Sequence, residues 1–279
     1  MPHIIDGKKL AGEIRARLKT EIAALSAVPG LAIILVGDDP ASHTYVGLKE
    51  KAAEDIGMHF ERHMFPADTT QAALVKRINE LNQRSDIHGI VVQLPLPGKS
   101  FDTDAIIQTI APDKDVDGFH PTNIQALLAG NPRITPGLAE GIFRLIASTN
   151  ESLPGKKAMI FANSPVFSNP LEYILNQHGI QTVSCAPGVD DAIVVSRQAD
   201  IIVAVIGKPN FVTGEMVKDG AILIDVGFTK QNGQVSGDIA PSAVAKARWA
   251  TPVPGGVGPM TVAMLLENVL HAFRLQQAQ

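Results

Sequence analysis

The stretch Leu31-Ala32-Ile33-Ile34-Leu35-Val36, followed at once by Gly37-Asp38-Asp39-Pro40, decides the fold class. Its apolar run has no polar interruption, and it ends at a cluster of residues that favour turns. An uninterrupted apolar run of this length is typical of a strand that is covered on both faces, as in a parallel sheet. The sequence therefore predicts a buried parallel strand over residues 31–36.

The segments around this strand alternate between helical and extended patterns. Apolar residues recur at helical spacing over four segments, 7–28, 42–57, 70–84 and 103–110, while extended patterns cover 59–65 and 89–94. We take Ser42 as the N-cap of the second helix and Gly57 as the glycine that ends it. The resulting order, β-α-β-α-β, is typical of a parallel sheet with crossover helices.

The second half of the chain repeats this organisation. A helix over 137–149 precedes strands expected at 157–162, 182–184, 200–205 and 221–226, with helices at 169–178 and 262–275. We expect two α/β domains flanking a cleft. The first covers residues 1–136 and is completed by the C-terminal helix, 260–279, which returns to it. The second covers residues 137–259 and is a Rossmann-like, doubly wound parallel sheet that binds a dinucleotide.

Composition and charge exclude several classes of function. The chain has 279 residues, of which 45% are hydrophobic and 19% charged, and its net charge is −4. We therefore expect a globular protein without nucleic-acid partners, since no basic stripe is present. No apolar run reaches the roughly 18 residues of a membrane span. The single cysteine and the absence of a signal-like segment favour the cytoplasm, and no histidine has metal-ligand spacing.

Three residues of the first half form a candidate site. Tyr45 and Lys49 are one helical turn apart and share a face, which places an aromatic ring beside an amine. Taken alone, this pair is as expected of an ordinary surface helix. Gln93 stands at the carboxyl end of its strand, where ligands of α/β sheets gather. Its amide needs hydrogen-bond partners there, and either a ligand or a structural partner such as Lys49 would serve.

Two further segments have unusual composition. Asp113, Asp115 and Asp117 alternate around Lys114, and one of these carboxylates could accept two N–H groups from a heterocycle. We interpret the nearby His120 as structural or as part of a substrate rim. The segment 254–259 combines prolines with three glycines, so it is rigid yet allows close approach of its backbone. We interpret it as a loop that faces a ligand.

Four motifs, taken together, resemble a known enzyme family over nearly the whole chain. They are Tyr45-x-x-x-Lys49, Gln93-Leu94-Pro95-Leu96-Pro97, Asp115-Val116-Asp117-Gly118-Phe119-His120-Pro121 and Pro252-Val253-Pro254-Gly255-Gly256-Val257-Gly258-Pro259-Met260-Thr261. In order and spacing they are similar to those of the methylenetetrahydrofolate dehydrogenase/methenyltetrahydrofolate cyclohydrolase family. The resemblance implies hydrolysis of 5,10-methenyl- to 10-formyltetrahydrofolate, and NADP-dependent oxidation of 5,10-methylenetetrahydrofolate.

The resemblance also implies roles for individual residues. Lys49 would be the catalytic lysine, Gln93 would tune it, Asp117 would hold the pterin ring, and Tyr45 would stack on the folate. Three residues, Pro254, Gly255 and Gly256, would border the folate. The family further implies a homodimer that forms through the second domain. Water addition to the bridging carbon of the substrate needs a group that moves protons near neutral pH, and a lysine is suited to this task.

The expected dinucleotide loop departs from the family pattern. The family writes Gly-Arg-Ser-x-x-Val-Gly-x-Pro, whereas this chain has Ala162-Asn163-Ser164-Pro165-Val166-Phe167-Ser168-Asn169-Pro170. Two glycines and the arginine that often neutralises the 2′-phosphate of NADP are replaced. We assign cofactor contacts to Ala162, Asn163, Ser164 and Phe228, and we expect NADP, with NAD or no cofactor as alternatives. A cyclohydrolase without dehydrogenase activity and a folate-binding paralogue without turnover remain competing interpretations.

Overall fold

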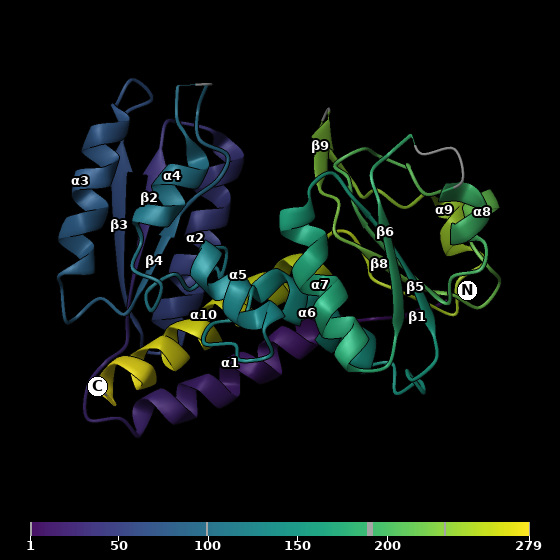
Figure 1. The fold of residues 1–279 in the computed structure, drawn as a ribbon, viewed down its shortest axis with the longest axis horizontal. Helices are drawn as coiled ribbons and strands as arrows, with labels where there is room; N and C mark the ends of the chain where they lie inside the picture. The colour runs from purple at the N-terminus through teal and green to yellow at the C-terminus, as the bar shows by residue number, and fades with distance from the viewer. Residues whose placement is uncertain (1, 99, 189–191, 232, 279) are drawn as a thin grey trace. The chain divides into compact units, whose positions relative to one another are not determined.

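The structure, a computed structural model, describes residues 2–98, 100–188, 192–231 and 233–278 (Figure 1). The chain divides into two compact units. One comprises Met1–Ala11 and Leu138–Thr261, and the other comprises Gly12–Gly137 and Val262–Gln279. The first eleven residues were predicted to belong to the latter unit. They belong to the former because strand β1 (His3–Ile4) pairs with strand β11 (Trp249–Ala250).

The unit that contains Gly12–Gly137 is built on a three-stranded parallel sheet. Its order is β3-β2-β4, with β2 at Gly30–Val36, β3 at His59–Phe65 and β4 at Gly89–Val92. Ile33 pairs with Arg62 on one side and with Val91 on the other. All seven residues of β2 are buried, which confirms the covered parallel strand predicted from the apolar run.

Helices cover both faces of this sheet. Helix α3 (Gln71–Asn82) and helix α4 (Thr103–Thr109) pack on one face, while helix α2 (Pro40–Asp55) contacts β2 and β3. Helix α2 begins before Ser42, so the N-cap prediction was wrong. The cap is Asp39, whose carboxylate accepts from the Ser42 N–H at 2.8 Å, because Pro40 suits the first helical turn. Gly57 has a φ of 81° beyond the helix end, as predicted.

Three other helices belong wholly or partly to this unit. Helix α5 (Pro121–Leu128) was not predicted, since its eight residues are too few to show a clear period. Helix α1 (Gly7–Ala23) is shorter than predicted. Helix α10 (Val257–Gln277) begins before the predicted residue 262. Gly258 and Pro259 fit its first turn because N–H groups there have no intrahelical acceptor. Arg17 with Glu267, and Arg274 with Glu21, join α1 to α10.

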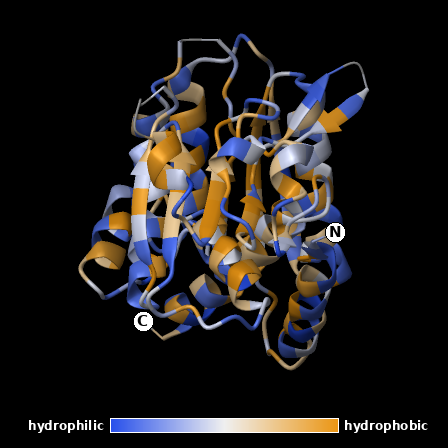
Figure 2. Ribbon diagram, turned by 90° about the vertical axis from the view of Figure 1, so that its right-hand side faces the viewer, coloured by the Kyte–Doolittle hydropathy of each residue, from blue (hydrophilic) through white to orange (hydrophobic). Residues whose placement is uncertain are grey.

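The other unit is built on a six-stranded parallel sheet (Figure 2). Its strand order is β1-β11-β8-β7-β5-β6, with β5 at Lys157–Ala162, β6 at Gln181–Cys185, β7 at Ile201–Val205 and β8 at Ile222–Asp225. The chain passes from β5 to β6 on one side and then crosses to β7 on the other side of β5. This reversal is the switch point of a doubly wound sheet, as the sequence predicted.

Short elements complete this unit. They are helices α6 (Gly137–Ala147), α7 (Pro165–Gln177), α8 (Ala192–Ser196) and α9 (Pro241–Val244), the 3₁₀ turn η1 (Gly214–Met216), and the paired strands β9 (Thr229–Gln231) and β10 (Gln234–Ser236). Helix α7 begins before the predicted residue 169, because Ser164 caps it and Pro165 occupies its first turn. Among the described helices, none is long and apolar enough to span a membrane.

Candidate active site

A direct hydrogen bond joins two of the predicted site residues. Lys49 on α2 donates from Nζ to Oε1 of Gln93, which follows β4, at 2.9 Å. The Gln93 amide is held at its other end, because Nε2 donates to the Leu94 carbonyl at 2.8 Å. The Gln93 backbone N–H in turn donates to the Ile34 carbonyl of β2 at 2.9 Å. The sheet therefore sets the direction in which the carboxamide oxygen faces the amine.

Tyr45 lies one turn before Lys49 on the same helix. Val46 and Ala53 anchor α2 through its buried face, and Tyr45 and Lys49 flank that face and are half-buried. Burial raises the pKa of the Tyr45 hydroxyl above its ordinary value. The phenol therefore stays neutral in the physiological range, so it offers a ring for stacking and a hydroxyl for hydrogen bonding, but no charge.

The acidic segment separates into a structural and an accessible carboxylate. Asp115 is buried and accepts hydrogen bonds from the backbone N–H groups of Gly118 and His120 and from Nδ2 of Asn123. Burial raises the pKa of Asp115. Asp117 is half-buried at the turn that these bonds organise. Asp115 therefore builds the turn, and Asp117 is the carboxylate of the pair left partly accessible.

His120 has a structural position. It is the N-cap of α5, and its Nδ1 accepts from the Thr122 N–H at 3.1 Å. Gly118 also has a structural requirement, with a φ of 82° and a position where an added Cβ would lie 2.7 Å from the Pro136 nitrogen. The loop thus needs glycine for reasons that local spacing does not show.

The proline- and glycine-rich segment belongs to the unit of the six-stranded sheet. The Val253–Pro254 peptide is cis, and Gly255 has a φ of 113°. The carbonyl of Gly255 accepts from the Lys8 N–H at 2.9 Å, and a Cβ on Gly7 would lie 1.9 Å from the Gly256 oxygen. At Gly256 the backbone of this segment closely approaches the start of helix α1, and the predicted approach to a ligand stays a prediction. The contact of Gly7 could not be predicted from the sequence, in which its glycine identity was the one signal.

Three of the predicted cofactor residues, Ala162, Asn163 and Ser164, lie at the carboxyl edge of the six-stranded sheet, where β5 and β7 adjoin. Asn163 follows β5 and donates from Nδ2 to the Ile206 carbonyl after β7 at 2.7 Å. Ser164 caps α7 by accepting from the Val166 N–H. This is the position at which doubly wound sheets bind dinucleotides, and the amino end of α7 adds a favourable partial positive charge for phosphate.

The side chains that replace the family's two glycines do not obstruct this edge. Ala162 and Ser168 are 6% and 5% exposed, so both side chains point into the protein. Gly207, which follows β7, is exposed with a φ of 74°, and no atom lies within 4 Å of the place where a Cβ would be. Phe228 is 43% exposed after β8. The residues present therefore fit a dinucleotide, although the Asn163 amide is already bonded to protein.

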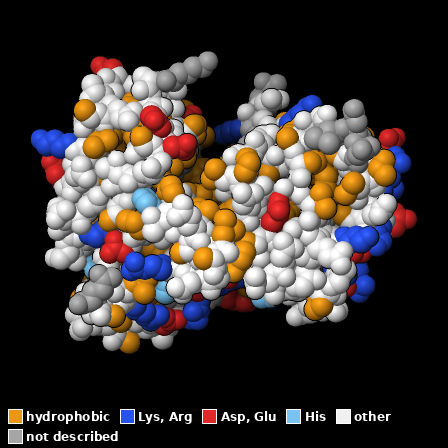
Figure 3. Space-filling view, in the orientation of Figure 1, with side chains coloured by type: hydrophobic (Ala, Val, Ile, Leu, Met, Phe, Trp, Pro, Cys, Tyr) orange, Lys and Arg blue, Asp and Glu red, His pale blue; other side chains and the backbone are white. Residues whose placement is uncertain are grey.

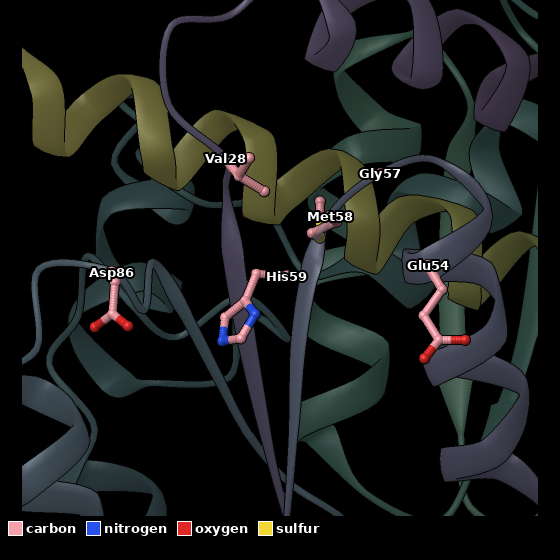
Figure 4. Close-up of a pocket in the computed structure, with 6 residues that line it drawn as sticks. All are labelled: Val28, Glu54, Gly57, Met58, His59 and Asp86. Carbon is pink, nitrogen blue, oxygen red and sulfur yellow. The ribbon is translucent and has the colours of Figure 1, made fainter.

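The unit of the three-stranded sheet has a pocket of its own (Figure 4). It is lined by Val28, Glu54, Gly57, Met58, His59 and Asp86, which precede or begin strands at the amino edge of the three-stranded sheet. Gln93 follows the opposite, carboxyl edge. None of the predicted site residues lines this pocket.

In the part of the chain that the structure describes, one group of side chains could hold a metal ion, and it shares His59 and Asp86 with the pocket. His59, Glu61 and Asp86 have ligand atoms within 4.8 Å of one another, a grouping that sequence spacing did not reveal. Arg84 donates to both oxygens of Glu61 and also pairs with Asp86. This guanidinium lowers the pKa of Glu61 to about 2. Both carboxylates therefore already have a cationic partner.

Cys185, at the end of β6, packs against the core of its unit, as expected for a small hydrophobe.

Comparison with known proteins identifies the two parts of the chain. The family described as "Tetrahydrofolate dehydrogenase/cyclohydrolase, catalytic domain" matches residues 5–117. The description "Tetrahydrofolate dehydrogenase/cyclohydrolase, NAD(P)-binding domain" matches residues 136–277. The "Bifunctional protein FolD" of Moorella thermoacetica is 44% identical over 276 residues, covering 97% of this chain and 98% of that protein. The protein of the same name from Bacillus subtilis is 42% identical, covering 96% of each.

Solved structures agree with these matches. The bifunctional methylenetetrahydrofolate dehydrogenase/cyclohydrolase of Campylobacter jejuni is 37% identical, with a TM-score of 0.93 over 99% of each chain. The Trypanosoma brucei enzyme, solved with NADP cofactor and inhibitor, is 34% identical, with a TM-score of 0.94 over 100% of this chain and 99% of that one.

Proposed function

This chain belongs to the tetrahydrofolate dehydrogenase/cyclohydrolase family, and on that premise we propose that it interconverts one-carbon derivatives of tetrahydrofolate. It hydrolyses 5,10-methenyltetrahydrofolate to 10-formyltetrahydrofolate, and it oxidises 5,10-methylenetetrahydrofolate with NADP. The observation that carries this proposal is the Lys49–Gln93 hydrogen bond, because it holds an amine in a set direction beside the end of β4.

The cyclohydrolase step requires proton movement. Water adds to the bridging carbon, and it loses protons as the carbonyl forms. The bond from that carbon to N5 breaks in the same step, and N5 gains a proton. Lys49 is the group that we assign to this transfer, and the carboxamide oxygen of Gln93 orients its amine. Tyr45 supplies a neutral ring for stacking, and Asp117 supplies a carboxylate for the N–H groups of the pterin.

The proline- and glycine-rich segment is also part of this assignment. We assign Pro254, Gly255 and Gly256 to contacts with the folate. Gly255 has a φ of 113°, which suits glycine. Because it has no side chain, its main chain is open to close approach by a ligand.

The dehydrogenase step depends on the six-stranded unit. Bound NADP would supply the acceptor for the hydride, and the protein holds and orients it. We assign the cofactor contacts to Ala162, Asn163, Ser164 and Phe228, at and beside the edge between β5 and β7. NADP is supported by the similar Trypanosoma brucei enzyme, whose structure contains that cofactor.

A homodimer fits the edge of the six-stranded sheet. Strand β6 is the last in the order, and its Val183 is 49% exposed. Nearby in the sequence, α8 exposes three apolar side chains, Ile193, Val194 and Val195. Hydrophobic side chains are visible on the face of the unit that carries β6 (Figure 3). A second copy that covered this edge would pair its open backbone groups.

We also assign the protein to the cytoplasm, where a lone thiol such as Cys185 stays reduced.

Separate assays of the two half-reactions test this function. Hydrolysis of methenyltetrahydrofolate is followed without nicotinamide, and oxidation of methylenetetrahydrofolate is followed with NADP and with NAD. We expect both reactions, with NADP as the better oxidant. Hydrolysis without oxidation by either dinucleotide would limit the protein to the cyclohydrolase, and failure of both reactions would refute the proposal.

A further inference from the structure

A fully buried carboxylate lies at the carboxyl edge of the six-stranded sheet, where β5 and β7 adjoin. Asp238 is 0% exposed, and its Oδ2 accepts from two consecutive backbone N–H groups, Ile206 at 2.6 Å and Gly207 at 3.0 Å. These two residues follow β7. The Asn163 amide, after β5, donates to the carbonyl of the same Ile206. Asp238 therefore holds the β7 loop, and through Ile206 it is linked to the loop that begins α7.

A second buried carboxylate extends this arrangement to β8. Asp225 accepts from the N–H groups of Gly227 at 3.0 Å, Asp238 at 2.9 Å and Ile239 at 2.9 Å. The loop after β8 and the segment around Asp238 are thus tied together. Three loops at the carboxyl edge, those after β5, β7 and β8, are joined by two carboxylates and one amide.

Two glycines make room for these carboxylates. A Cβ on Gly227 would lie 2.2 Å from Cγ of Asp238, and a Cβ on Gly237 would lie 2.0 Å from Oδ2 of Asp225. Backbone therefore wraps closely around both side chains. The cradle holds each carboxylate against the main chain of the neighbouring loop.

A role in stability alone does not account for Asp238. Among the described residues, no lysine or arginine forms an ion pair with it, and its Oδ1 is buried without a hydrogen-bond partner. A buried carboxylate in this state costs free energy, and an apolar side chain of similar volume would pack at lower cost. The carboxylate fixes the position of the N–H groups of Ile206 and Gly207 by accepting hydrogen bonds from them, which an apolar group cannot do.

We propose that Asp238 is a positioning residue for the dinucleotide, acting by holding the Ile206–Gly207 backbone at the edge where β5 and β7 adjoin. This inference rests on the proposed function, because it assumes that NADP binds at that edge. Asp238 itself does not contact the cofactor. Its effect reaches NADP through the exposed backbone of Gly207 and through Asn163.

Two substitutions at Asp238 separate positioning from charge. Asp238→Leu removes the acceptor but keeps a branched side chain with the same number of heavy atoms, whereas Asp238→Asn keeps one oxygen able to accept from both N–H groups. The matched control is Asp200→Ala. Asp200 also accepts from a backbone N–H, that of Lys157 at 2.9 Å, but at the amino edge of the same sheet. The readouts are the KM and Kd for NADP, the kcat for methenyltetrahydrofolate hydrolysis, and the Tm.

We expect Asp238→Leu to raise the KM and Kd for NADP by about tenfold or more, because the variant loses the hydrogen bonds that a charged carboxylate makes to two backbone N–H groups. Hydrolysis per folded enzyme should stay within about twofold, since that reaction uses no nicotinamide. Asp238→Asn should restore NADP affinity to within about threefold of the unmodified protein. Asp200→Ala should lower the Tm without changing the KM for NADP.

The outcomes distinguish this inference from the proposed function. NADP affinity that is unchanged in Asp238→Leu, while the unmodified protein binds NADP, would overturn the positioning role alone. An unmodified protein that binds neither NADP nor NAD would overturn this inference together with the dehydrogenase half of the proposed function. If little of the leucine variant folds, KM and Kd still report on the folded fraction, because neither depends on its concentration. Asp238→Ser, with a smaller side chain, then provides the second measurement.

Discussion

Lys49 Nζ and Gln93 Oε1 lie 2.9 Å apart, although 44 residues separate them in the chain. The bond joins the middle of helix α2 to the carboxyl end of strand β4. Because the Gln93 Nε2 is bonded to the Leu94 carbonyl, the carboxamide cannot turn its oxygen away from the amine without losing a hydrogen bond. The amine is therefore oriented before substrate arrives.

Replacement of this lysine should remove hydrolysis. We expect Lys49→Met to lower the kcat for methenyltetrahydrofolate hydrolysis by about 100-fold or more, the usual contribution of a positioned proton-transfer group. Folate binding should remain measurable, because the stacking ring of Tyr45 is kept. Lys51→Met, at an exposed position of the same helix, is the matched control and should retain the wild-type rate. Hydrolysis at the wild-type rate in Lys49→Met would disprove the role of Lys49.

Two glycines of helix α1 should respond in opposite directions to alanine. A Cβ on Gly7 would lie 1.9 Å from the Gly256 oxygen, so we expect Gly7→Ala to destabilise by about 3 kcal/mol or more through displaced backbone. A Cβ on Gly12 would meet no atom within 4 Å, so Gly12→Ala should stabilise by about 1 kcal/mol through helix propensity. Urea unfolding of both variants measures this. Equal effects would show that the contact with Gly256 is unimportant.

The turn that carries Asp117 should depend on Gly118. An alanine there would combine a φ of 82° with a Cβ 2.7 Å from the Pro136 nitrogen. We expect Gly118→Ala to cost about 2–4 kcal/mol in the free energy of unfolding, and to raise the KM for the folate by moving Asp117.

Gly155→Ala provides the control for Gly118→Ala. Gly155 has a φ of 84° but no neighbour within 4 Å, so it should show the smaller cost of backbone conformation alone, about 1 kcal/mol. A folate KM that does not change in Gly118→Ala would argue against the assignment of Asp117.

The buried Asp225 should make stability depend on pH. Burial raises the pKa of Asp225 to about 6, above its ordinary value of 3.8, so the folded state favours the protonated acid. Its contribution is present in full below the unfolded pKa and is lost as pH rises through 6. The free energy of unfolding should therefore lose up to about 3 kcal/mol between pH 4 and 7 from this group.

Unfolding at several pH values tests the effect of Asp225. Urea titrations of the unmodified protein and of Asp225→Asn are compared from pH 4 to 7. The variant should lose this part of the pH dependence, whatever its stability at a single pH. Parallel pH profiles for the two proteins would show that Asp225 does not titrate in this range.

The local sequence was sufficient for elements that bury a continuous apolar pattern. The run at 31–36 predicted a covered strand, and β2 is buried throughout. The helical pattern around Tyr45 and Lys49 predicted α2, apart from its cap. Helix starts were less well predicted at α7 and α10, because prolines and glycines that read as loop residues also fit the first turn of a helix.

The two α/β patterns, the family and the residues to assign to folate and to NADP can all be recognised from the amino-acid sequence. Which of these residues touch, and which polar groups support them, follows from the folded chain. In the fold, β1 pairs with β11 although most of the chain separates the two strands. Lys49 is hydrogen-bonded to Gln93, and Asp225 and Asp238 are buried among backbone N–H groups. The alternation of buried and exposed positions along a helix or strand depends on neighbouring residues, so it can be recognised in the local sequence. A hydrogen bond between distant residues depends on how strands align in the sheet, and no local pattern records that alignment.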